Sequence, residues 1–164
     1  KLEEILFEAL GPGGVSIIIE GIADNKNRAM GEVKQILSQH NGKLVGEGAV
    51  KWLFERKGTI IVNCKSQIEN LTNKEALELK AIEVGAEDVY WKDDVLEIYT
   101  KPEEIEMVKK NLEQKGIKID SASLDWQAKE MIELSDKEKE SCRKLFEELD
   151  ELDSVQEIYA NIQL

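Results

Sequence analysis

The chain has 164 residues and a mass of 18.6 kDa, which is enough for one ordinary domain or two small ones. Charged residues make up 34% and apolar residues 41% of a sequence with only two prolines, which argues against disorder. No apolar run approaches the roughly 20 residues that span a bilayer, and no secretory signal pattern opens the chain. We therefore expect a cytoplasmic protein without membrane contact.

The net charge of −12 is unevenly distributed along the chain. Residues 1 to 65 carry nine Lys/Arg and eight Asp/Glu, a net charge of +1. The remaining 13 basic and 26 acidic residues give residues 66 to 164 a net charge of −13. Because an acidic surface repels phosphate backbones, any contact with nucleic acid is expected in the first part.

The first predicted elements are two strands, at residues 2–10 and 15–22. The second strand is nearly all β-branched and apolar on both faces, as in the centre of a sheet. Between them, Pro12 suits the second position of a turn, and Gly13 suits the third position, where a type II turn requires a positive φ. The pattern predicts a hairpin.

An amphipathic helix follows this hairpin. Asp24 and Asn25 are natural N-caps, and apolar side chains then recur at helical spacing until Asn41-Gly42. A short strand at 43–45 and a further strand at 49–55 come next. This stretch thus supplies a strand, a helix and two more strands.

From Thr59 the predicted order is β-α-β-β-α-β, the ferredoxin-like unit. Two features mark it most clearly: a turn at Asp93-Asp94 between two strands, and a helix that begins at Pro102. The six elements are a strand at 59–63, a helix at 73–84, strands at 87–92 and 95–100, a helix closed by Gly116, and a strand at 117–124.

The last predicted elements are a helix that begins with a capping box at Ser135 and Glu138, and a strand at 155–162. They have no partner of their own, but they complete the set of elements between Val15 and Glu55. We therefore predict an α+β protein with two ferredoxin-like β-α-β-β-α-β domains, each an antiparallel sheet with helices on one face. A continuous domain at 58–128 is inserted in a discontinuous domain made of 1–57 and 129–164.

The glycine-rich turn does not match a nucleotide-binding loop, because a strand and not a helix follows it. The single histidine, His40, ends a helix without a nucleophile nearby, and we expect it to pack or to cap that helix. An acidic pair at a hairpin tip is usually a solvated turn and not a metal site. We expect no catalytic residue, no cofactor and no metal.

Two basic clusters remain as candidates for a binding surface. The run DNKNR places Asn25, Lys26 and Arg28 at a helix N-terminus, where cations, amides and backbone N–H groups can meet phosphate. One interpretation is a contact surface for RNA or another macromolecule. The other is ordinary solvated charge.

The second cluster, KWLFERK, contains Lys51, Arg56 and Lys57. In a strand, Lys51 and Lys57 would share one face, while Trp52, Phe54 and Arg56 would alternate on the other. The same two interpretations apply here, with the solvated charge lying over a packed aromatic pair.

The sequence resembles the YebC family, to which the mitochondrial translational activator of cytochrome c oxidase also belongs. The resemblance covers essentially the whole chain in order. It rests on the runs GPGGVSIIIEGIADNKNRAMGEVKQILSQHNGKL, GAVKWLFERKG, AIEVGAEDV with DDVLEIYT, and LDELDSVQEIYANIQL.

This resemblance implies a three-domain protein whose first domain is a basic helical bundle, absent here, with the third domain inserted in the second. It also implies a non-enzymatic translation factor that associates with the ribosome and supports translation of difficult sequences, such as proline-rich ones. The alternative is a DNA-binding transcriptional regulator.

The expected partner is thus the ribosome and its RNA, or promoter DNA in the alternative, contacted mainly through the basic domain. We expect a monomer, located in the cytoplasm or, for an organellar member, in the mitochondrial matrix. The residues of this chain that we expect to share in the contact are Asn25, Lys26, Arg28, Lys51, Arg56 and Lys57.

Overall fold

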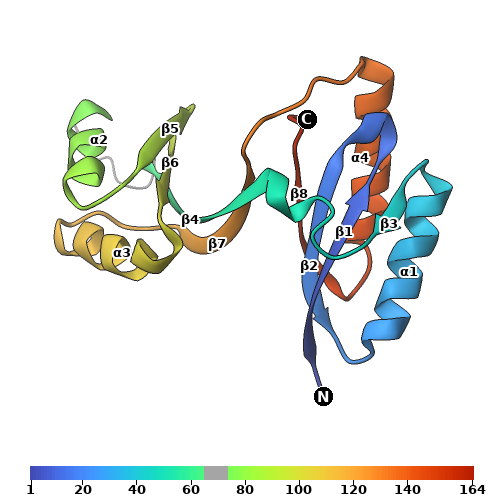
Figure 1. Cartoon of the computed structure of the whole chain (residues 1–164). Helices are drawn as coiled ribbons and strands as arrows, with labels where there is room; N and C mark the ends of the chain where they lie inside the picture. Colours follow the sequence, from blue (N-terminus) through green and yellow to red (C-terminus); the bar gives the residue numbers. More distant parts are fainter. Residues whose placement is uncertain (65–73) are drawn as a thin grey trace. The chain divides into compact units, whose positions relative to one another are not determined.

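The computed structural model describes residues 1–64 and 74–164, and it is an α+β fold with two antiparallel four-stranded sheets, as predicted. The chain divides into two compact units, each with its own sheet (Figure 1). The first unit comprises Lys1–Glu55 and Trp126–Leu164, and the second comprises Arg56–Asp125. Among the described helices, none has the length and apolar character needed to cross a bilayer.

The first sheet has the strand order β3-β1-β2-β8. Strands β1 (Glu3–Leu10) and β2 (Ser16–Ala23) pair antiparallel along their whole length, which confirms the predicted hairpin. Gly13 has a φ of +72°, and Gly14 N donates to Gly11 O at 3.1 Å to close the turn. The outer strands are β3 (Lys43–Val45) and β8 (Val155–Ala160).

The two helices of the first unit lie on one side of its sheet (Figure 1). Helix α1 (Lys26–Gln39) begins at the predicted N-cap Asn25, and α4 (Asp136–Asp150) begins with the predicted capping box. Alternate residues of the central strands point toward these helices, as strand geometry requires. The shared core is formed mainly by Ile5, Phe7, Ala9, Ile17, Ile19, Val33, Leu37, Leu145 and Leu149.

The predicted strand at 49–55 is wrong. Lys51–Leu53 form a 3-10 turn, and strand β4 (Phe54–Asn63) begins only after it and belongs to the second sheet. Gly58 lies inside β4 and does not divide it. The first sheet has four strands without 49–55, because β1 belongs to it and pairs with β2 along all eight of its residues.

The second sheet has the strand order β5-β6-β4-β7, and its elements follow the predicted β-α-β-β-α-β order. Helix α2 ends at Glu83, one residue before its predicted end, and Asn73, its predicted first residue, lies outside the described residues. The other elements are α2 (Lys74–Glu83), β5 (Asp88–Lys92), β6 (Val95–Thr100), α3 (Ile105–Gln114) and β7 (Ser121–Ala128).

Strand β7 begins four residues later than the predicted strand at 117–124. Ile117 lies at the end of α3 and not in a strand. Its N–H donates to Leu112 O at 3.1 Å, and its apolar side chain is buried in the core of the second unit. Gly116, with a φ of +82°, allows the chain to turn at this point. The helix end therefore uses an apolar residue that the prediction assigned to the sheet.

Candidate nucleic-acid interface

The first predicted cluster surrounds the N-terminus of α1. Asn25 accepts a hydrogen bond from the backbone N–H of Arg28 at 3.0 Å, so its side chain caps the helix. Lys26 is exposed, and the Arg28 guanidinium forms an ion pair with Asp24, with 62% and 60% of the two side chains exposed. Exposed pairs of this kind contribute about 0–1 kcal/mol, so Arg28 can exchange Asp24 for a phosphate at little cost.

The loop at 46–53 is shaped by a carboxylate that sequence reasoning missed. Glu8, on β1, is only 3% exposed. Its Oε1 accepts hydrogen bonds from Val50 N at 3.0 Å and Lys51 N at 2.7 Å, and its Oε2 accepts one from Gly48 N at 2.6 Å. These bonds to a charged acceptor are stronger than neutral ones and hold the loop in its turn.

Burial alone would raise the pKa of Glu8, because it disfavours the charged carboxylate. The three backbone N–H donors and the nearby Lys51 charge outweigh this effect, so the pKa lies below its usual value of 4.5. Glu8 is therefore a buried carboxylate that stays ionised at neutral pH.

The 3-10 turn separates side chains that the prediction placed together. Phe54 is buried with Ile18 under the sheet, whereas Trp52 points outward and is 65% exposed, so the predicted packed pair of Trp52 and Phe54 is wrong. The reason is that side chains in a 3-10 turn repeat their direction every three residues, whereas side chains in a strand repeat it every two. The Lys51 ammonium lies 5.1 Å from the ring centroid of Trp126.

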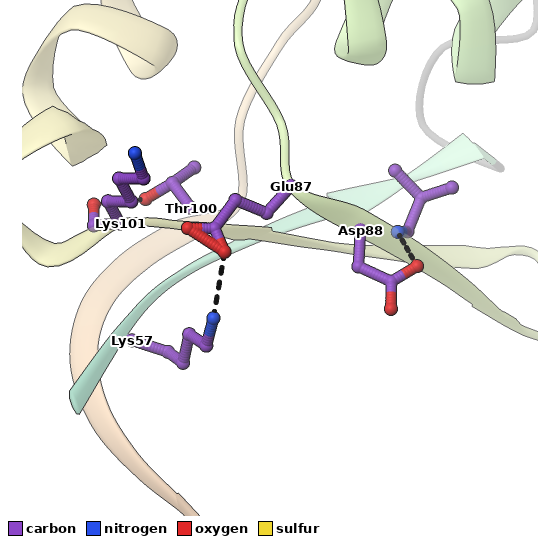
Figure 2. Close-up of polar contacts among 6 residues, drawn as sticks. Lys57, Glu87, Asp88, Thr100 and Lys101 are labelled. Atoms are coloured by element: carbon purple, nitrogen blue, oxygen red, sulfur yellow. Dashed lines mark hydrogen bonds and ion pairs between the residues drawn. The ribbon is translucent and has the colours of Figure 1, made fainter. Parts of the chain in front are cut away.

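The remaining two candidates lie in the second unit. Lys57 Nζ forms an ion pair with the Glu87 carboxylate at 2.9 Å, and only 17% of the Lys57 side chain is exposed. Figure 2 shows this pair beside the end of β6, where Thr100 Oγ1 donates to Lys101 O at 2.8 Å. Arg56 is half-buried. Lys57 thus serves a contact within its own unit.

The structure therefore does not gather the six predicted residues into one surface. Asn25, Lys26 and Arg28 lie together at the start of α1, whose core contacts are on one face of the first sheet. The loop of Lys51 packs against the opposite face, through Val50. Arg56 and Lys57 belong to the second unit.

The single histidine and the two cysteines of the chain lie among the described residues and have structural contacts. His40 is the C-cap of α1, and its Nε2 contacts the Glu148 carboxylate on α4. Burial raises the pKa of the Cys64 and Cys142 thiols, so both are weak nucleophiles at neutral pH. Within residues 1–64 and 74–164, there is no group of three or more His, Cys, Asp or Glu arranged to hold a metal ion.

These features define an α+β protein with two ferredoxin-like units and exposed cations on its first unit. A family model described as the TACO1/YebC second and third domain matches residues 2–162. The chain therefore belongs to the TACO1/YebC family.

Relatives and a solved structure agree with this assignment. The chain is 38% identical, over all its residues, to a probable transcriptional regulatory protein of Thermoanaerobacter pseudethanolicus, and 41% identical to one of Aquifex aeolicus. The crystal structure of a conserved hypothetical protein from Aquifex aeolicus is similar with a TM-score of 0.90 and 40% identity, over 99% of this chain. The chain spans 65%, 64% and 65%, respectively, of the lengths of these three proteins.

Proposed function

We propose that this chain is part of a non-enzymatic regulator of gene expression that associates with the ribosome and its RNA. In this role it supports translation of difficult sequences, such as proline-rich ones, and acts as a monomer in the cytoplasm, or in the mitochondrial matrix in an organellar member. The resemblance implies this role. The relatives, which are named as probable transcriptional regulatory proteins, support its coarser part, a regulator of gene expression.

The single structural observation that carries the proposal is the exposed pair Lys26 and Arg28 at the start of α1. A helix N-terminus attracts anions through its dipole, and the two side chains add positive charge at the same point. Asn25 serves this surface indirectly, because it caps the helix that presents it. Phosphates of ribosomal RNA are the proposed ligands.

The units of the structure have a proposed correspondence with the family's domains. Lys1–Glu55 with Trp126–Leu164 would be the second domain, and Arg56–Asp125 would be the third. The description of the matching family model, which names these two domains, supports this correspondence.

A second candidate function is that of a promoter-binding transcriptional regulator. The relatives are named as probable transcriptional regulatory proteins, which favours this candidate. The net charge of −13 over residues 66 to 164 disfavours contact of this part of the chain with the phosphates of DNA and of RNA alike, so the charge does not separate the two candidates.

Cosedimentation with ribosomes at several salt concentrations, beside a promoter-DNA shift assay, separates the two candidates. We expect salt-sensitive pelleting with ribosomes, weakened when Lys26→Glu and Arg28→Glu are combined. Arg143→Glu, which reverses one charge, is the control, since Arg143 is also exposed and forms an ion pair with a nearby carboxylate, that of Glu140. Binding to promoter DNA without pelleting with ribosomes would refute the leading function and support the second.

A further inference from the structure

Trp52 is the most exposed aromatic side chain among the described residues, and its orientation is held in place. The indole Nε1–H donates to Ala49 O at 3.0 Å, within the same loop. The loop itself is held by the three hydrogen bonds to Glu8. The chain thus presents a large aromatic ring to solvent on a support that has little freedom to move.

The support is costly to build, which indicates that the loop's shape matters. Within residues 1–64 and 74–164, Glu8 is the only Asp, Glu, Lys or Arg that is fully buried. Taking a carboxylate out of water is unfavourable unless hydrogen bonds compensate for the lost hydration. The loop supplies these bonds from its backbone, so carboxylate and loop conformation depend on each other.

The surroundings of Trp52 fit a nucleic-acid strand better than a protein. The part of this stretch that lies in the first unit, residues 43–55, contains two Lys and two Glu and is thus neutral in a chain of −12. Lys51 precedes Trp52 in the same 3-10 turn and places a positive charge beside it. A protein hot spot lies at the centre of a packed interface. Within the loop at 46–53, all of whose residues the structure describes, Trp52 is however the only large apolar side chain that is exposed. Stacking of a base requires just one ring, with positive charge nearby.

We infer that Trp52 is a base-stacking residue: an unpaired base of single-stranded RNA lies on its indole ring, beside the positive charge of Lys51. This inference rests on the proposed association with RNA and specifies its chemistry. Bases in loops and bulges of RNA are unstacked from their neighbours and therefore accessible to an aromatic ring, whereas paired bases are not. The contact should consequently discriminate single strands from duplexes.

Fluorescence anisotropy with a labelled 12-nucleotide RNA, free and annealed to its complement, tests the inference. Trp52→Ala should weaken binding of the single strand about tenfold, and Trp52→Phe should retain most of the affinity. Binding of the duplex should not change in either variant. Tyr90→Ala is the matched control, because Tyr90 is an aromatic residue that is 54% exposed on β5 of the second unit. The Tyr90→Ala variant should bind the single strand with the affinity of the parent chain.

Ribosome cosedimentation of the same variants separates this inference from the proposed function. Equal binding of single-stranded RNA by the parent chain and Trp52→Ala would overturn the inference, while salt-sensitive pelleting of both would leave the proposed function standing. Loss of pelleting in Trp52→Ala with unchanged RNA affinity would assign Trp52 to a protein contact and overturn base stacking. Failure of the parent chain to bind both RNA and ribosomes would refute both proposals.

Discussion

Replacing Glu8 by glutamine tests the idea that a buried carboxylate holds the loop at 46–53. The side chain keeps its size, so the change alters only charge and hydrogen bonding. If the amide oxygen takes the position of Oε1, it can still accept from Val50 N and Lys51 N. The amide nitrogen then faces Gly48 N, where two donors meet and no hydrogen bond forms.

The expected loss follows from these three contacts. A hydrogen bond to a charged acceptor contributes about 1.5–3 kcal/mol and a neutral one about 0.5–1.5 kcal/mol. The lost bond costs about 2 kcal/mol and each of the two bonds that become neutral costs about 1 kcal/mol, so we expect the free energy of unfolding to fall by about 4 kcal/mol. This is a large effect for a change that adds or removes no side-chain volume.

Urea unfolding followed by circular dichroism measures this loss through the midpoint and the slope of the transition. Glu4→Gln is the matched control, because Glu4 lies on the same strand with its side chain exposed, and it should stay within about 0.5 kcal/mol of the parent. A loss below 1 kcal/mol for Glu8→Gln would refute the role of the charge.

The same carboxylate predicts a pH dependence with a definite sign. Because the pKa of Glu8 is lower in the folded chain than its ordinary 4.5, its stabilisation is fully present above that value. It is lost as the pH falls through the lower pKa of the folded state. The difference in unfolding free energy between the parent and Glu8→Gln should therefore shrink below pH 4.5, and a difference that grows there would contradict the assignment.

Two further predictions concern the packing and capping of the first unit. Gly21→Ala places a Cβ 1.7 Å from Ser154 O, so we expect a loss of about 3 kcal/mol in thermal unfolding, and an unchanged melting temperature would contradict this contact. Ser135→Ala removes the N-cap of α4 and should cost about 1 kcal/mol in urea unfolding. Ser141→Ala, inside the same helix, is its control and should cost nothing. Equal losses for the two serine variants would argue against the cap.

The parts of the fold that could be predicted are those determined by neighbouring residues. The hairpin at Gly13 and the caps at Asn25 and Ser135 depend on contacts within three residues, so the local pattern identifies them. The predicted strand boundaries were less accurate where an apolar residue packs in the core without belonging to a strand. Ile117 is such a residue. It packs in the core at the end of α3, and an apolar residue type alone does not distinguish this position from a place in a strand.

The candidate site was predictable by residue type but not by arrangement. The cations are visible in the sequence, whereas the contacts that decide their availability join distant residues. Lys57 and Glu87 are 30 positions apart, and Glu8 and Gly48 are 40 positions apart. One sequence without related sequences contains no signal that pairs them. An acidic residue between apolar neighbours, as at Glu8, is the one local sign that a buried partner exists.

The arrangement of the first unit also limits how it can contact RNA. Some four-stranded α+β domains bind single strands on an open sheet face that carries aromatic residues. Here α1 and α4 cover one face of the sheet, and Val50, Phe54 and Trp126 pack over Ile18 on the other. Neither of these packed areas is open to a strand. The proposed contacts with RNA lie outside these packed areas, at the start of α1 and at the loop of Trp52.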